Sequence, residues 1–493
     1  MKMKQMMIIS ALCGAILLTS CGTAATTGDT TVEPTTAATT TEDGTTAAET
    51  TAAGTTETTA AGTTAVPETE TTAVESGANL KRLEPVYAAE AFDTSDSAEV
   101  TRCLAFGMTA AEVAIVRGLA RLAERALPEL AAASPDENVV FSTPSLALAL
   151  GMLAQGAEGA TREELLTALD QPEDGDWMAS LIAALNVSWE EEDLPELTIE
   201  SSRALWLQDG YRLRAEYGEM ASRVWHADIN VWAPGERDAA HETIGQWYEE
   251  KSHGLLPAST VPDDLPNEGT SLILLDALYY KAQWLESFDA RGTEADIFRL
   301  ADGEVVPVLM MLKQLQAQRA LVRDDYQIAQ LPMAGGYQFV VALPTGERGA
   351  DELLADKDFR RDFMASSMST KEYDIMWQLP KLDLALGADL LPLLPKLGVT
   401  TAMSAEADFG ALFEDARPGD FVLDVLRQDA RLLLDEDGVE AAAVTLAAVK
   451  ATAMPSVCET LEMRLDRPFI AEIRSEGGLP LFSMVVRDPG VRP

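Results

Sequence analysis

The feature that most restricts how this chain can fold is a run of small residues, 439–454, that contains neither proline nor glycine. If the run is a strand, alternate side chains point to opposite sides of it. From residue 439 to residue 450, the six side chains on one side are small and uncharged: Val439, Ala441, Ala443, Thr445, Ala447 and Val449. The other side carries both charges, Glu440 and Lys450. Such a strand could join the middle of a sheet, because its charges would stay in water and every backbone N–H is free to pair.

The same run is also compatible with a buried helix. It is rich in alanine, and alanine has the highest helix propensity of all residues. The segment taken alone does not decide between the two structures, so the decision depends on the rest of the chain.

Residues 1–20 have the pattern of a secretion signal. Lys2 and Lys4 precede an apolar stretch that ends at Leu18 and is too short to span a bilayer. The small residue before Cys21 resembles the lipobox of bacterial lipoproteins, whose cysteine becomes the lipidated N-terminus. We therefore expect Cys21 to anchor the mature protein at the cell surface. The alternative is an ordinary secretion signal, and in both cases the protein leaves the cytoplasm.

Residues 21–80 are expected to be a disordered stalk. They consist mostly of threonine and alanine, and such a segment buries too little apolar surface to offset its chain entropy. A flexible coil of this length has an end-to-end distance of about 40 Å. Neither a repeat nor a second linker follows the stalk, so we expect one domain over residues 81–493.

The charge and the cysteines limit the partners of this domain. The chain has 80 acidic and 37 basic residues and a formal net charge of −43. A surface this acidic repels nucleic acid and anionic lipid head groups, so the lipid at Cys21 is the only membrane contact we expect. Processing leaves Cys103 and Cys458, which do not make a disulfide framework. We expect a monomer held together by its hydrophobic core.

The sequence offers little for catalysis. Its three histidines, His226, His241 and His253, suggest no triad. His241 could begin a zinc-protease motif, but Gly245 stands where the second histidine is required. Neither a phosphate-binding glycine loop nor a paired-cysteine metal motif occurs. We therefore expect no catalytic residues, no metal site and no cofactor.

The predicted elements indicate an α+β fold. Apolar residues at helical spacing predict helices over 111–130 and 146–155. A short β-type run broken by proline is expected over 138–145, and further β-like runs cover 197–207, 271–280, 339–344 and 373–380. Helices and strands do not alternate regularly, which argues against a doubly wound parallel sheet.

Several motifs, in order along the chain, resemble the serpin family. Glu436-Asp-Gly-Val-Glu-Ala-Ala-Ala is similar to the hinge of the serpin reactive-centre loop. The others are Asn138-Val-Val-Phe-Ser-Thr-Pro-Ser-Leu, Gly156-Ala-Glu-Gly-Ala-Thr-Arg-Glu-Glu-Leu, Asp276-Ala-Leu-Tyr-Tyr-Lys-Ala-Gln-Trp, Leu379-Pro-Lys, Arg467-Pro-Phe and Pro480-Leu-Phe-Ser-Met-Val-Val-Arg-Asp-Pro. The resemblance covers about residues 109–491 and favours the strand over the helix for the small-residue run.

The resemblance implies a serpin-like fold with several sheets, a large central β-sheet, surrounding helices and an exposed reactive-centre loop. It assigns the loop hinge to Glu436, Gly438, Val439, Glu440, Ala441, Ala442 and Ala443. It assigns the sheet-opening region to Ser142, Ser145, Asp276 and Gln428. Asp276 stands where the family usually has Asn, and Gln428 where it often has His. We therefore expect unusual rates of sheet opening.

The function that the resemblance implies is suicide inhibition. A protease attacks the exposed loop and forms an acyl-enzyme, after which the cut loop inserts into the central sheet and carries the protease away. The family's usual span from Glu436 places the attacked bond between Thr452 and Ala453. Small residues there suit elastase-like or subtilisin-like serine proteases as partners, acting outside the cell.

Several alternatives stay open. The arm of the loop after the attacked bond is longer than usual, so the cut could follow Lys450 and indicate a trypsin-like target. A cysteine protease is a further possible target. The chain could also be a non-inhibitory serpin-fold protein that acts as a binding or chaperone module, or a structural surface protein.

The alternation in the small-residue run is testable with two neighbouring substitutions. Ala443→Arg places a charge on the side to be buried, which costs several kcal/mol and competes with insertion. Ala442→Arg places it on the side facing water. We expect the first variant to become a substrate that the protease cleaves and leaves, and the second to remain an inhibitor. The number of inhibitor molecules consumed per protease inactivated measures the difference, and equal numbers for both variants would show that the alternation is misplaced.

Overall fold

The structure is a computed structural model that describes residues 108–173, 175–189, 196–263, 265–267, 269–365, 371–423, 425–439 and 458–493. The signal, the stalk, Cys21, Cys103 and loop residues 440–457 lie outside the described residues. The helices of the described part that exceed three residues are α3 (Ala110–Ala133), α4 (Thr143–Gly156), α5 (Gly159–Leu169), α6 (Asp176–Ala184), α7 (Ala215–Arg223), α8 (Arg237–Lys251), α9 (Ala350–Ala355), α10 (Lys357–Met364) and α11 (Leu394–Leu397).

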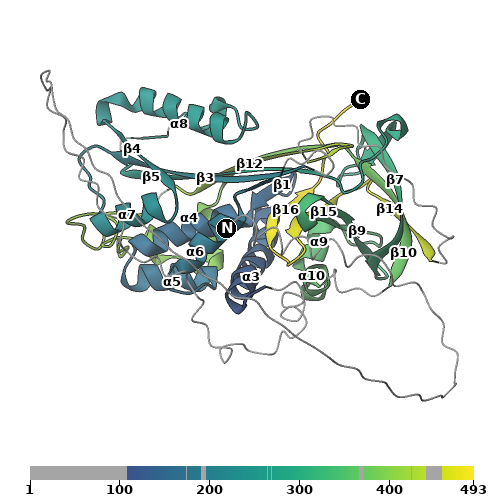
Figure 1. The fold of residues 1–493 in the computed structure, drawn as a ribbon, viewed down its shortest axis with the longest axis horizontal. Helices are drawn as coiled ribbons and strands as arrows, with labels where there is room; N and C mark the ends of the chain where they lie inside the picture. The colour runs from purple at the N-terminus through teal and green to yellow at the C-terminus, as the bar shows by residue number, and fades with distance from the viewer. Residues whose placement is uncertain are drawn as a thin grey trace, which may run out of the picture. The chain divides into compact units, whose positions relative to one another are not determined.

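The strands form two sheets, and the α+β class is confirmed (Figure 1). Seven strands belong to the first sheet: β2 (Val187–Trp189), β3 (Leu197–Gln208), β4 (Ala227–Trp232), β5 (Leu272–Gln283), β11 (Leu382–Asp389), β12 (Arg427–Leu434) and β13 (Gly438–Val439). Their order is β11-β12-β13-β5-β3-β2, with β4 on β3. We call this sheet the central sheet.

The second sheet has nine strands: β1 (Val139–Ser142), β6 (Glu294–Arg299), β7 (Val305–Val322), β8 (Tyr326–Pro332), β9 (Tyr337–Pro344), β10 (Glu372–Pro380), β14 (Glu459–Arg464), β15 (Phe469–Ser475) and β16 (Pro480–Val486). Its order is β1-β16-β15-β9-β8-β7-β10-β14, with β6 on β7. The β-like runs predicted over 197–207, 271–280, 339–344 and 373–380 are confirmed as β3, β5, β9 and β10.

The two predicted helices are present, and the second begins earlier than expected. Helix α3 begins after Thr109, which forms a capping box with Glu112. For α4, the side chain of Ser142 accepts a hydrogen bond from the Ser145 backbone N–H, and Pro144 lies in the first turn. Proline is tolerated there because the first N–H groups of a helix have no partner within it. The run expected over 138–145 is therefore a short strand followed at once by a helix.

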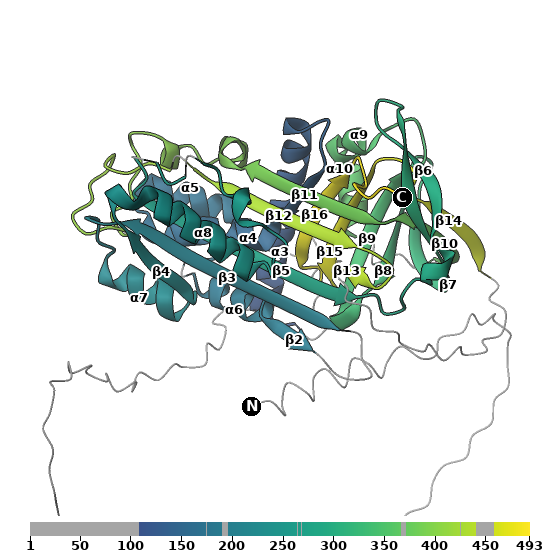
Figure 2. The same ribbon diagram turned by 90° about the horizontal axis from the view of Figure 1, so that it is seen from above.

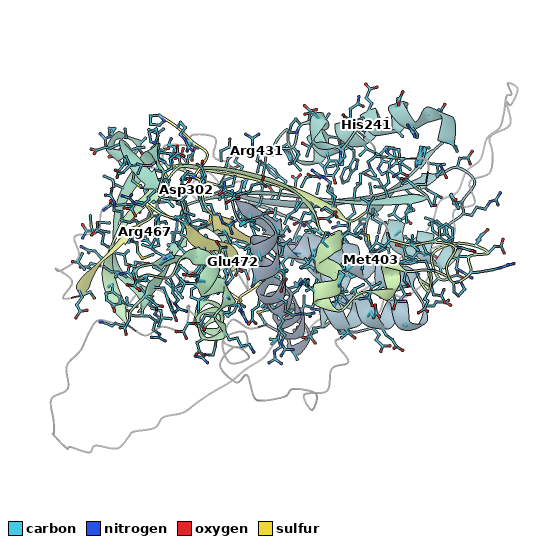
Figure 3. All side chains as sticks on the ribbon, turned by 180° about the vertical axis from the view of Figure 1, so that it is seen from behind. His241, Asp302, Met403, Arg431, Arg467 and Glu472 are labelled. Carbon is cyan, nitrogen blue, oxygen red and sulfur yellow. The ribbon has the colours of Figure 1, made fainter. Side chains whose placement is uncertain are left out.

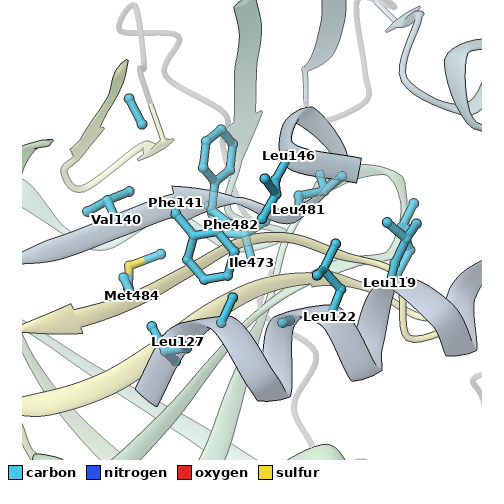
Figure 4. Packing of buried hydrophobic residues seen from close by; sticks show 14 of the residues in the cluster. Leu119, Leu122, Leu127, Val140, Phe141, Leu146, Ile473, Leu481, Phe482 and Met484 are labelled. Carbon is cyan, nitrogen blue, oxygen red and sulfur yellow. The ribbon is translucent and has the colours of Figure 1, made fainter. Parts of the chain in front are cut away.

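Helices cover both faces of the central sheet (Figure 1). Helix α8 lies on one face over a separate apolar cluster that includes Trp206, Trp247 and Ile244. Figure 2 shows the sheet from above, with α8 lying across it. The main core lies on the other face, where α3 packs Leu119 and Leu122 near β1, β15 and β16 (Figure 4). A residue of the central sheet therefore belongs to one core or the other, according to the face of the sheet to which its side chain points.

The segment that follows α8 contacts strand β12 of the central sheet. His241 lies on α8, and Arg431 on β12 lies on the same side of the sheet (Figure 3). The Nη1 of Arg431 donates to the carbonyl oxygen of Leu255, just after α8, at 3.4 Å. In the part of the chain that the structure describes, no helix is long and apolar enough to cross a membrane.

Candidate functional site

The candidate site is the seam of the central sheet between β5 and β12. Val439 of the two-residue strand β13 pairs with Ala282 on β5 and with Leu434 on β12. Among the described residues, the ladders connect β5 to β12 only through β13. The two halves of the sheet are therefore joined at one end of the seam, by the first residues of the predicted loop hinge.

A turn before β13 fixes the hinge by backbone hydrogen bonds. The backbone N–H of Trp284 donates to Asp437 O at 2.9 Å, and the N–H of Phe288 donates to Glu436 O at 2.8 Å. The indole Nε1 of Trp284 donates to Asp435 O at 2.9 Å. Because every one of these donors follows β5 in the chain, the hinge is held by the end of that strand.

Glu436 fixes the hinge to two further elements. Its side chain is largely buried, with the carboxylate 2.6 Å from Lys381 Nζ and accepting a hydrogen bond from Thr293 Oγ1 at 2.7 Å. Burial raises the pKa of Glu436, but the hydrogen bonds from Lys381 and Thr293 outweigh it, so the pKa is lowered overall. The carboxylate is therefore charged and paired at neutral pH.

Gly438 lies closer to β5 than any other residue type allows. Its φ of +146° is a conformation that residues with a side chain rarely adopt. A Cβ atom at this position would lie 2.2 Å from the carbonyl oxygen of Ala282. Glycine is therefore required for β13 to lie in the seam.

Gln428 and Ser142 join strand β12 of the central sheet to the start of helix α4. The backbone N–H of Ser142 donates to Gln428 Oε1 at 2.9 Å, and Gln428 Nε2 donates to the Ser142 carbonyl oxygen at 3.0 Å. Because an amide both donates and accepts, Gln428 satisfies both backbone groups of Ser142. Ser142 in turn caps α4 through Ser145.

Asp276 lies on β5 in the same region, with its side chain buried. The Ser145 hydroxyl on α4 faces its carboxylate, and the carboxylate pairs with Arg203 on β3 at 3.8 Å. Ser142, Ser145, Asp276 and Gln428 are thus brought together by the fold. That they control opening of the sheet stays a prediction.

Sequence reasoning assigned no role to Trp284, Lys381, Thr293 or Arg203. Trp284 and Lys381 end two of the motifs that carry the family resemblance, so the signal for them was present. Thr293 and Arg203 belong to no such motif and are identified only by their contacts. The predicted reactive bond Thr452–Ala453, the hinge residues Glu440, Ala441, Ala442 and Ala443, and Cys21 lie outside the described residues.

Comparisons with known proteins agree on one family. The family model for Serpin (serine protease inhibitor) matches residues 117–489. Serpin-ZXA of Oryza sativa subsp. japonica is 26% identical over 372 residues, which are 73% of this chain and 93% of that protein. Alpha-2-antiplasmin of Bos taurus is 29% identical over 373 residues, which are 74% of this chain and 70% of that protein.

Solved structures show the same fold. Cleaved Serpin 42Da matches with a TM-score of 0.65 and 22% identity, covering 77% of this chain and 99% of that one. Tengpin, a thermophilic serpin in the native state, matches with a TM-score of 0.64 and 22% identity, covering 76% and 94%. A complex of thyroxine-binding globulin with thyroxine matches with a TM-score of 0.61 and 22% identity, covering 77% and 99%.

The close approach at Gly438 predicts the effect of adding one methyl group. Gly438→Ala should displace β13 from the seam and lower the free energy of unfolding of the uncleaved protein by about 1–3 kcal/mol, the usual cost of a strained backbone. Urea unfolding measures this loss. Gly218→Ala is the matched control, because that glycine lies in α7 with open space around its Cβ position. Equal stability of Gly438→Ala and the unchanged protein would contradict the close fit.

Proposed function

The chain belongs to the serpin family, and we propose on that premise that it is a suicide-substrate inhibitor of serine proteases. The observation that carries the proposal is the seam, where β5 and β12 are joined only by β13 among the described residues. Because β13 consists of Gly438 and Val439, the first residues of the hinge already lie between the two halves of the sheet. The inhibitory mechanism requires insertion at this position.

The remainder of the hinge is suited to extend β13. The side chains that would turn inward from Val439 to Val449 are small and uncharged. Each residue added to the ladder contributes backbone hydrogen bonds worth about 0.5–1.5 kcal/mol each. Insertion is therefore expected to be strongly favourable once the loop has been cut and is free to move.

The sequence of the loop suggests the class of the target protease. The proposed bond between Thr452 and Ala453 has a small residue on each side. A shallow substrate pocket accepts such residues, so elastase-like or subtilisin-like proteases are the proposed partners. Cleavage after Lys450 would instead indicate a trypsin-like enzyme, and a cysteine protease is a further alternative.

The serpin fold also has uses other than inhibition. Thyroxine-binding globulin, whose complex with thyroxine has a TM-score of 0.61 to this chain, shares the fold. A non-inhibitory binding protein is therefore the second candidate. Bulky or charged residues in the inward set of the loop would favour it, whereas the inward set here is small and uncharged.

The site of action is proposed from the N-terminal sequence. Removal of residues 1–20 would leave Cys21 as a lipidated N-terminus, and residues 21–80 would then separate the inhibitor from the membrane. An inhibitor attached in this way would meet proteases outside the cell, at a bacterial surface.

Incubation with single proteases tests the proposed function. We expect elastase or subtilisin to form a covalent adduct that survives boiling in detergent, and the released fragment to begin at Ala453. Cleavage of the loop should also raise the melting temperature sharply, because the inserted strand completes the central sheet. Trypsin and papain serve as comparison enzymes, and Ala443→Arg is the control that should be cleaved without forming an adduct. Cleavage with neither adduct nor higher melting temperature would indicate the non-inhibitory alternative.

Replacement of the proposed lipidated residue tests the location. Cys21→Ser should move the protein from the membrane fraction to the soluble fraction, because the lipid has no other attachment point. Inhibition should be unchanged, since Cys21 and the stalk precede the domain. Retention of the variant in the membrane fraction would contradict lipid anchoring through Cys21.

A further inference from the structure

Strand β4 lies at the border of the central sheet and carries apolar side chains into solvent. It pairs in parallel with β3 and, within the described residues, with no other strand. Figure 2 shows β4 at this border, near helix α7. The side chains of Ile229 and Val231 are 41% and 62% exposed. Val231 is thereby the most exposed large hydrophobic residue in the part of the chain that the structure describes.

The two faces of β4 have different surroundings. Trp232 belongs to the apolar cluster under α8, and Asp228 accepts a hydrogen bond from the indole Nε1 of Trp247 on α8 at 3.2 Å. Because side chains alternate along a strand, Asp228 and Trp232 face α8, whereas Ile229 and Val231 face the other side of the sheet. Neither of these two residues belongs to the apolar clusters of the described domain. Their exposure is therefore not needed by either core.

The backbone of β4 has hydrogen-bonding groups on its outer side. The carbonyl oxygen of Trp232 accepts a hydrogen bond from the N–H of Asp209, which follows β3, at 2.7 Å. Successive residues of a strand direct their backbone groups to opposite sides, so alternate residues back from Trp232 point towards β3. The N–H and C=O groups of Ile229 and Val231 therefore point away from β3. Such a row of backbone groups is a template for pairing with another chain.

The edge formed by β4 lacks the features that usually prevent such pairing. Edge strands of natural proteins are commonly protected by charged side chains, by proline or by bulges. Residues 229–233 contain neither a charge nor a proline, although 24% of the chain is charged. The one charged residue of β4 is Asp228, which faces α8. The register with β3 runs from 227 to 232 without a bulge. The edge is therefore regular, apolar and open to a further strand.

This edge is complementary to a second copy of itself. When two copies of β4 run antiparallel about a two-fold axis at Asn230, Ile229 of each copy lies opposite Val231 of the other. Both residues have their backbone groups on the outer side, so each opposed pair exchanges two N–H···O bonds, as hydrogen-bonded pairs of antiparallel strands do. The two apolar side chains of each pair then lie on one face, close enough to pack. Asp228 lies opposite Trp232, so the two carboxylates do not face each other.

We propose that this chain forms a dimer with a second copy of itself, by antiparallel pairing of the two β4 strands about Asn230. Both copies use the same surface, so the contact is closed and association stops at two. Because the contact is small, the dimer is reversible and depends on concentration. It uses no residue of the reactive-centre loop and does not rest on the proposed inhibitory function. The alternative is the monomer that the sequence analysis expects.

The charge of the chain determines how the dimer responds to salt. Each copy has a formal net charge of −43, which opposes association at long range. The distance over which charges act falls from about 30 Å at 0.01 M salt to about 8 Å at 0.15 M. The contact itself is made by uncharged side chains and backbone groups, which salt does not screen. Association is therefore expected to become stronger as the salt concentration rises.

The first test measures association in solution. Sedimentation equilibrium is recorded over a range of concentrations for the full chain with Cys21→Ser, so that no lipid drives association. We expect a reversible equilibrium between monomer and dimer, with more dimer at about 0.15 M than at about 0.01 M salt. A monomer at every concentration would refute the proposal and leave the edge to a segment of another protein. Growth beyond a dimer would contradict the closed contact.

Two lysine variants show whether β4 makes the contact. Val231→Lys places a charge opposite Ile229 of the partner subunit and removes two apolar pairs, so the dissociation constant should rise about tenfold or more. Val305→Lys is the matched control, because Val305 is an exposed valine on β7 of the second sheet. Both positions are open to solvent, so both variants should fold. Equal dissociation constants for the two variants would exclude β4 as the interface.

The second test locates the two-fold axis by cross-linking. Asn230→Cys and Ile229→Cys are each made in a full chain whose Cys21, Cys103 and Cys458 are replaced by serine, and both are oxidised. An axis at residue 230 brings the two new thiols of Asn230→Cys together with Cα atoms about 4.5 Å apart, within reach of a disulfide. The thiols of Ile229→Cys would lie about 7–8 Å apart on the diagonal, too far to bridge readily. We expect a disulfide-linked dimer of Asn230→Cys on a non-reducing gel. Faster cross-linking of Ile229→Cys, or none of either, would contradict the proposed pairing.

Discussion

The rest of the structure depends on a central sheet whose two halves are joined, within the residues that the structure describes, across only a few backbone hydrogen bonds. Strands β5 and β12 are each well paired on their outer sides, with β3 and β11 respectively, but meet each other only through β13 in the described residues. Backbone groups in a sheet are most stable when both sides of a strand are paired. The proposed insertion of the loop would add backbone hydrogen bonds along this seam.

Several contacts near the seam hold β5, β12 and β13 in their arrangement. Glu436 and Trp284 fix the turn before β13, and Gln428 fixes β12 to the start of α4. Helix α8 lies over the opposite face, where its following residue Leu255 accepts a hydrogen bond from Arg431. These contacts come from separate parts of the chain, so opening of the seam must break several at once. If the loop inserts as proposed, these contacts would contribute to the barrier against opening of the seam.

Asp276 acts against these contacts. Most buried charges in the domain have close partners, as Glu436 has Lys381 at 2.6 Å. Asp276 has Arg203 at 3.8 Å and no hydrogen bond of ordinary geometry. Buried polar groups without partners are uncommon in folded proteins. Asp276 lies on β5, beside the seam at which insertion of the loop is proposed.

The sequence by itself determined the mixture of helices and strands, the family, and which loop side chains can be buried, because these follow from local periodicity and from motifs with a fixed order. The extents of α3, β3, β5 and β10 were predictable for the same reason. The start of α4 also had a local signal that the sequence analysis missed, because Ser142 caps the helix through Ser145 and proline is tolerated in the first turn. Tertiary structure alone decided that β1 pairs with β16, which lies near the other end of the chain. It also decided the partners of Asp276: Arg203 lies far from it in the chain, and only the pairing of β3 with β5 brings the two side chains together.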